Sequence, residues 1–230
     1  FATSKAHGVN YCQVHMTAAG GDKSLGIPKL IEAARSGKAL ATAPIGTFEL
    51  ALADLAAAAT TNTVTADLLS RVKSDAGKAR VSQAGAEANI TGTAMIASAF
   101  GFLNTFNDLT GVKVEAAWAQ QSQETAGIEA GRHGVSEGRT STNLDHDLPE
   151  SGPSIEDMIA QYEGIVAAAG GVDAYATQEL GLMPSWIGLW PEPLRARQAL
   201  FYTEMMQARG HSPIASELKH LMARVSAISK

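Results

Sequence analysis

The chain of 230 residues is poor in cysteine, in aromatic residues and in long apolar runs. Its single cysteine excludes an internal disulfide framework, which suits a reducing compartment. No run of about eighteen apolar residues occurs, so we expect no membrane-spanning segment, and no signal-peptide pattern follows Phe1. The formal net charge of −5 and the lack of a Lys/Arg-rich run disfavour a nucleic-acid-binding surface. We therefore expect a soluble, cytoplasmic protein that binds neither membranes nor nucleic acids.

The chain is rich in alanine and glycine and contains many residues typical of helix ends. Many small residues with few aromatic ones favour closely packed helices over a β-sandwich. Pro28 in a first turn, Gly37 after a last turn and Thr65 before a periodic stretch are typical of helix ends. The predicted helices run from about Asn10 to Gly20, Ile27 to Gly37, Thr47 to Thr60, Ala66 to Lys73, Glu87 to Leu109, Ser154 to Gly170, Pro193 to Arg209 and Ser212 to Lys230. Strand patterns are essentially absent, so the sequence predicts an all-α, multi-helical fold.

Residues 120–152 lose the apolar periodicity and are rich in Gly, Ser, Thr, Asp and Glu. Such a composition is typical of a linker or a long surface loop. It divides the chain into a first part, residues 1–119, and a helical second part, residues 153–230. The long helix of the first part is predicted to bury its larger apolar residues, namely Ile90, Met95, Phe102, Phe106 and Leu109.

The only cysteine, Cys12, stands at the start of a predicted helix with His15 three positions on. Residues at this spacing can share one helix face. A thiol becomes a nucleophile when it ionises, which a helix N-terminus or a nearby base favours. A helix N-terminus stabilises a thiolate by only ~0.3–1 kcal/mol, which lowers the pKa of the thiol by less than one. We therefore predict Cys12 as a catalytic nucleophile and His15 as the base that takes its proton.

A structural interpretation of these residues stays open beside the catalytic one. A lone cysteine is commonly buried and inert, and a lone histidine is more often a hydrogen-bonding residue than a base. Tyr11 packs or hydrogen-bonds beside the site in this interpretation, and His7 caps the preceding helix. We include Tyr11 and His7 as supporting or substrate-binding candidates.

The remaining chemical candidates are weaker. Asp145-His146-Asp147 has suitable metal ligands, but its polar surroundings without helical spacing favour a solvated loop. His133 lies in the same irregular region. Trp186 and Trp190, with prolines around them, indicate a packed helix connection. The sequence therefore predicts neither a metal nor a cofactor.

The stretch from Ser4 to His15 resembles the motif of the alkylhydroperoxidase D-like and carboxymuconolactone decarboxylase superfamily. The similarity continues in the helix start at Leu25-Gly26-Ile27-Pro28 and in Ala97 to Val112, which resembles the closing helix of that family. Met183 to Lys230 resembles the helices that precede the motif. A short echo of Ala2–His7 in Val225–Lys230 agrees with such a rotated order. The resemblance thus implies an alkylhydroperoxidase D-like bundle, either a clipped tandem repeat or a circular permutant.

In the redox members of that family, the resemblance implies a Cys-x-x-Cys pair, a following histidine and an upstream glutamate. Cys12 matches the second cysteine, which attacks the substrate, and His15 matches the histidine of the proton relay. Val9 replaces the first cysteine, so a local disulfide cycle is impossible. The glutamate has no clean match in the C-terminal helix, where the corresponding residues are Lys219, His220 and, one turn away, Glu217.

Three functions follow from these observations. The resemblance favours a peroxidase-like oxidoreductase that takes an organic hydroperoxide and needs an external thiol reductant. The first alternative is a non-redox acid–base enzyme acting on a small carbonyl or lactone substrate, in which His15 matters and Cys12 does not. The second alternative is a non-catalytic subunit that uses its helices to assemble. A homo-oligomer is expected in all three cases.

Overall fold

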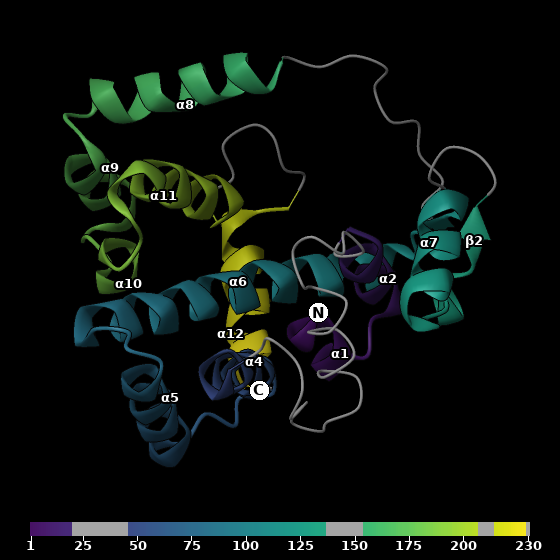
Figure 1. Ribbon diagram of the computed structural model, residues 1–230. Coiled ribbons are helices and arrows are strands. Elements are labelled where there is room, and N and C mark those ends of the chain that lie inside the picture. The colour runs from purple at the N-terminus through teal and green to yellow at the C-terminus, as the bar shows by residue number, and fades with distance from the viewer. Residues whose placement is uncertain (20–45, 137–153, 207–213, 229–230) are drawn as a thin grey trace. The chain divides into compact units, whose positions relative to one another are not determined.

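A computed structural model describes residues 1–19, 46–136, 154–206 and 214–228 (Figure 1). Eleven α-helices dominate these residues, and the only strands among them are two of two residues each. The prediction of an all-α, multi-helical fold is confirmed. The chain divides into two units, Phe1–His146 and Asp147–Lys230.

Among the described helices, none combines the length and the apolar character that crossing a membrane requires.

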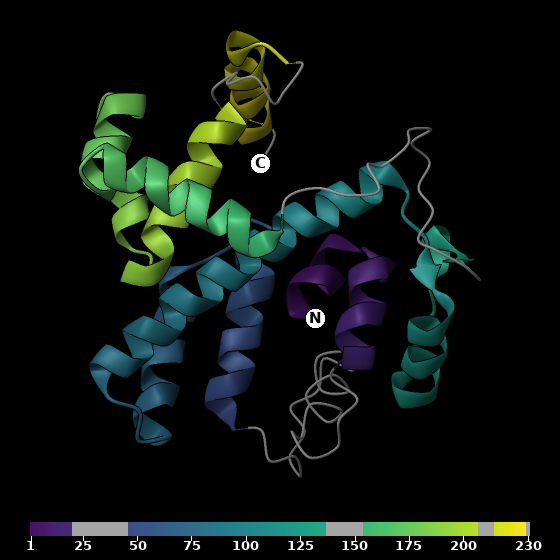
Figure 2. The ribbon, with the colours of Figure 1, turned by 90° about the horizontal axis from the view of Figure 1, so that it is seen from above.

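The first unit is built around one long helix, α6. Its elements are α1 (Ala2–His7), α2 (Asn10–Ala19), α4 (Thr47–Thr60), α5 (Ala66–Lys78), α6 (Gln83–Thr110), β1 (Val114–Glu115), α7 (Ala116–Ala126), the 3₁₀ turn η2 (Gly131–His133) and β2 (Val135–Ser136). The predicted N-cap is confirmed, because the Thr65 hydroxyl accepts a hydrogen bond from the Leu68 N–H. Ser82 caps α6 in the same way, through the Gly85 N–H. Helix α6 packs against α1, α2, α4 and α5, while α7 packs against α2 (Figure 2).

Helix α6 buries small and polar residues and leaves several of its large apolar residues exposed. Its buried residues are Ala86, Thr93, Ala97, Asn104 and Thr110. Phe102, Phe106 and Leu109 are 51%, 54% and 79% exposed, so the prediction that they are buried is wrong. Ile90 does pack against a core cluster, and Met95 is half-buried. Small residues on the buried face let neighbouring helices approach closely, and that face therefore contains few large side chains.

Two apolar clusters hold the first unit together. One joins α4, α5 and α6 through Phe48, Ala51, Leu55, Val72, Ala76 and Ala86. The other contains Val14 of α2, Val114 of β1, and Ile128 and Ala130, which follow α7. Tyr11 packs against this second cluster. The second cluster therefore supports the segment that carries the cysteine motif.

The prediction of a linker or long surface loop at residues 120–152 is wrong for the first part of this range. Helix α7 continues to Ala126, η2 and β2 follow, and β2 pairs in parallel with β1, Val114 opposite Val135 and Glu115 opposite Ser136. Apolar periodicity is weak there because α7 fully buries only the small polar Ser122. The rest of the predicted linker lies outside the described residues, as do the helix predicted at Ile27 to Gly37 and the Asp145-His146-Asp147 stretch.

The second unit contains α8 (Ile155–Ala168), α9 (Val172–Leu180), α10 (Ser185–Gly188), α11 (Glu192–Met206) and α12 (Ser216–Ile228). Its core consists of Val166, Tyr175, Ile187, Ala199 and Leu200. Trp186 packs against this core and meets the Tyr202 ring edge-on at 5.2 Å. The Trp186 region is therefore a packed helix connection, as predicted. Helix α12 contacts α11 and exposes Leu218, Leu221, Met222, Val225 and Ile228.

Candidate functional site: a His–Glu–Tyr cluster beside a buried thiol

A tight turn places the cysteine motif at the start of α2. Helix α1 ends at Gly8, whose φ of 71° lies in the left-handed region that glycine adopts without strain. The N–H groups of Gly8 and Val9 donate to the Lys5 and Ser4 carbonyls, and α2 begins at Asn10. This turn leads into α2, which packs against α6, α7 and η2.

The His15 imidazole is fixed at both of its ring nitrogens. Nδ1 lies 2.9 Å from the Tyr11 carbonyl oxygen, and Nε2 lies 2.8 Å from Glu115 Oε2. A carbonyl oxygen only accepts, so Nδ1 must carry a hydrogen. An unprotonated Nε2 would then direct its lone pair at a carboxylate oxygen. The contact is favourable only when one of the two groups carries a proton, and its angle is not that of a linear hydrogen bond.

Tyr11 completes this cluster. Its hydroxyl donates to Glu115 Oε1 at 3.3 Å, so each oxygen of the Glu115 carboxyl group has a site residue beside it. Burial first, and then the charge and hydrogen bond of Glu115, raise the pKa of Tyr11 to about 12. The Tyr11 ring lies 4.2 Å from the His15 ring and the Trp118 ring lies 5.2 Å from it, centroid to centroid.

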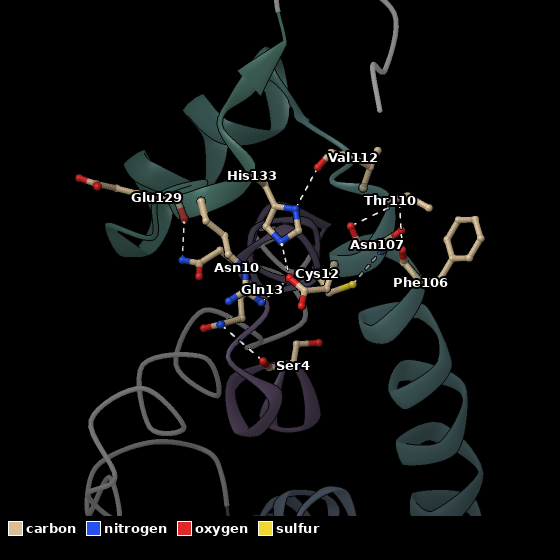
Figure 3. Close-up of polar contacts among 12 residues, drawn as sticks. Ser4, Asn10, Cys12, Gln13, Phe106, Asn107, Thr110, Val112, Glu129 and His133 are labelled. Carbon is tan, nitrogen blue, oxygen red and sulfur yellow. Dashed lines mark hydrogen bonds and ion pairs between the residues drawn. The ribbon is translucent and has the colours of Figure 1, made fainter. Parts of the chain in front are cut away.

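Cys12 has a different partner from His15. Its side chain is buried, and Asn107 Nδ2 of α6 donates a hydrogen bond to Sγ at 3.3 Å (Figure 3). Burial raises the pKa of the Cys12 thiol, and the hydrogen bond from Asn107 partly opposes that effect. His15 directs both ring nitrogens elsewhere, so the predicted proton transfer from Cys12 to His15 has no direct hydrogen bond in this arrangement. Cys12 and His15 do not interact with each other because Cys12 contacts α6, whereas His15 contacts the Glu115 carboxylate at the start of α7.

The two other predicted site residues follow the same division. His7 Nδ1 accepts a hydrogen bond from Nδ2 of Asn104, 3.2 Å away and one turn of α6 before Asn107. His7 and Cys12 are thus held by α6, while Tyr11 and His15 are held by Glu115. Val9, which replaces the first cysteine of the implied pair, is buried.

Sequence reasoning missed Glu115, Asn107, Asn104 and Trp118. The resemblance led us to look for the carboxylate upstream of the motif, with Glu217 of α12 as the nearest acidic residue. The structure places Glu115 beside His15, downstream of the motif. The sequence gives only a partial indication of where Glu115 lies. Gly111, with a φ of 62°, ends α6 and so sets where the following strand begins.

Within the described ranges, no group of three or more His, Cys, Asp or Glu side chains is arranged to hold a metal ion.

Neither a family model nor a curated protein nor a solved structure matches this chain. The resemblance to the alkylhydroperoxidase D-like superfamily therefore stays a prediction from the quoted residues. The function has to be argued from the geometry of the site.

Proposed function

We propose that Tyr11, His15 and Glu115 form the proton-transfer centre of a non-redox enzyme acting on a small carbonyl or lactone compound. The observation that carries this proposal is the 2.8 Å contact between His15 Nε2 and Glu115 Oε2, which is favourable only when one of the two groups carries a proton. A pair that holds one exchangeable proton is the basic requirement of general acid–base catalysis.

The pair has the chemistry for both directions of proton transfer. With its proton, it can protonate an enolate carbon; without it, it can accept a proton from the carbon next to a carbonyl group. The Tyr11 hydroxyl keeps its proton at neutral pH, because its pKa is about 12, and so acts as a hydrogen-bond donor. The side chains of His15 and Glu115 are 19% and 29% exposed, whereas the Glu115 Oε2 atom that faces His15 is buried.

A second candidate, the peroxidase-like oxidoreductase, is favoured by the hydrogen bond from Asn107 to Cys12 Sγ. That bond stabilises a thiolate, which would attack the outer oxygen of an organic hydroperoxide, break the O–O bond and release an alcohol. The resulting sulfenic acid would be reduced by an external thiol, since Cys12 is the only cysteine in the sequence. This candidate ranks second because burial raises the pKa of the thiol.

One experiment separates these candidates. Purified protein is incubated in D2O with small lactones, 2-oxo acids and 3-oxo acids, and carbon-bound hydrogen exchange is followed by 1H NMR. His15→Gln should lower the exchange rate by ~10²-fold or more, since proton transfer by a positioned group contributes that much. Cys12→Ser should retain the wild-type rate. His220→Gln, which changes an exposed histidine of α12, is the matched control.

The other outcomes are equally informative. Consumption of an organic hydroperoxide that Cys12→Ser abolishes would establish the second candidate and overturn the first. If the chain shows neither activity, the function that remains is the non-catalytic subunit. Sedimentation analysis tests the homo-oligomer proposed in all three cases, and the cytoplasmic location also stays a prediction.

A further inference from the structure

The strand that carries Glu115 is held by the short segment that follows η2. Val114 and Glu115 of β1 pair with Val135 and Ser136 of β2, and the Val114 N–H donates to the Gly134 carbonyl at 3.1 Å. The Glu115 carboxylate can reach His15 only while β1 stays in this register. The position of residues 131–136 therefore affects the site directly.

His133 is the buried residue at the centre of this segment. Its side chain is 2% exposed, and Nδ1 lies 3.0 Å from the Val112 carbonyl oxygen, two residues before β1 (Figure 3). Because a carbonyl only accepts, Nδ1 carries the hydrogen. Nε2 has no hydrogen-bond partner among the described residues and lies 4.0 Å from Asp108 Oδ1. The His133 ring also lies 5.9 Å from the ring of Tyr11, the second partner of Glu115.

The residues just before His133 are tied to α6 and α2. Arg132 forms an ion pair with Asp108 of α6. On the other side, Asn10 Nδ2 donates to the Glu129 carbonyl at 3.1 Å, and the Asn10 side chain fills the space beside Gly131. His133 thus directly follows these anchored residues, and its Nδ1 reaches the Val112 carbonyl, two residues before β1.

We propose that His133 is a positioning residue for Glu115. Its Nδ1–H fixes the Val112 carbonyl, and through it the start of β1, so that the Glu115 carboxylate stays within hydrogen-bond distance of His15 and Tyr11. The inference rests on the proposed function only where it concerns catalysis. A misplacement of a catalytic group by about 1 Å can reduce a rate by ~10²-fold. The loss of this one hydrogen bond would therefore lower the rate of proton transfer.

The test uses two substitutions that each keep one nitrogen of His133. In His133→Asn, the side-chain amide can replace the Nδ1–H donor, whereas in His133→Gln it lies closer to the position of Nε2. Histidine-ring 15N NMR of the full chain, without any substrate, then reports whether His15 still holds a proton between Nε2 and Glu115. We expect the wild-type His15 signals in His133→Asn and their loss in His133→Gln. Unchanged His15 signals in a folded His133→Gln protein would overturn the proposal.

The wild-type protein provides a second measurement in case either variant does not fold. The His133 ring should show the tautomer with hydrogen on Nδ1, and the tautomer with hydrogen on Nε2 alone would overturn the proposal. If the wild type has proton-transfer activity, His133→Gln should lower kcat by about tenfold or more with KM unchanged, and His133→Asn should restore it. If the wild type is inactive but the NMR result holds, the proposed function fails and the positioning role stands.

Discussion

His15 Nε2 and Glu115 Oε2 lie 2.8 Å apart, although one residue belongs to α2 and the other to the short strand before α7. The Tyr11 carbonyl on one side and the Tyr11 hydroxyl on the other connect the same two side chains. His15, Glu115 and Tyr11 therefore form one cluster, in which moving any member changes the surroundings of the other two.

Replacing Glu115 with glutamine should change the hydrogen bonding of the His15 ring. The amide has nearly the same shape but carries no negative charge and can itself donate to Nε2, so the His15 ring signals in 15N NMR spectra should move from their wild-type positions. Proton-transfer activity should fall by ~10²–10⁴-fold. Glu124→Gln, at an exposed position of the following helix α7, is the matched control and should behave as the wild type. An unchanged His15 spectrum in Glu115→Gln would contradict the assignment.

The Cys12 thiol should react slowly with iodoacetamide at neutral pH. Burial raises the pKa of the thiol, so its alkylation rate at pH 7 should be about tenfold or more below that of a free cysteine peptide. The rate should still be rising at pH 9. Asn107→Leu removes the hydrogen bond that lowers the pKa and should slow the reaction further. A fast rate that is flat below pH 8 would instead support the redox candidate.

The stability of the protein should decrease in alkaline solution, partly through Tyr11. Folding raises the pKa of Tyr11 from its ordinary value of 10.0 to about 12, so the unfolded chain loses this proton first. The associated stability is present below pH 10 and is lost as the pH rises to 12. Partial exposure of the side chain screens the effect, which we expect to be about 1 kcal/mol. Between pH 8 and pH 11, the free energy of unfolding in urea should fall less in Tyr11→Phe than in the wild type. Equal decreases in the two proteins would contradict this prediction.

Substituting Gly131 tests the contact between η2 and α2. Its φ of +56° strains any side chain, and an added Cβ would lie 2.9 Å from Asn10 Cγ. Gly131→Ala should therefore cost ~2–3 kcal/mol in urea unfolding, from backbone strain plus the displaced Asn10 side chain. Gly8→Ala has a similar φ of +71° and open space around it, so it measures the strain alone, at ~1–2 kcal/mol. If both variants lose the same free energy of unfolding, the Asn10 side chain moves aside without cost and the predicted contact contributes nothing.

Local features of the fold were predictable from the sequence. Thr65 and Ser154 mark helix starts because their hydroxyls cap the N–H groups three residues on, which depends only on nearby residues. The turn at Gly8 and the helix from Asn10 were predictable for the same reason. The large apolar residues of α6 were misjudged because hydrophobicity alone does not say which face a neighbouring helix covers.

The partners of the motif could not be predicted from the sequence. Asn107 and Glu115 meet Cys12 and His15 only through the packing of α2 against α6 and α7. No local pattern encodes such a contact, since it depends on the register of β1 and on where α6 ends. Cys12 and His15 at helical spacing suggested a single pair, whereas packing assigned each of them its own partner.

The parallel pairing of β1 with β2 also sets an order of events during synthesis. On the ribosome, His15 emerges long before Glu115, and Glu115 emerges before Val135 and Ser136, which hold its strand in place. A nascent chain that ends after α6 can already join Cys12 to Asn107 but offers His15 no carboxylate. We therefore expect the proton-sharing pair to form only after residue 136 has left the exit tunnel, late in the folding of the first unit.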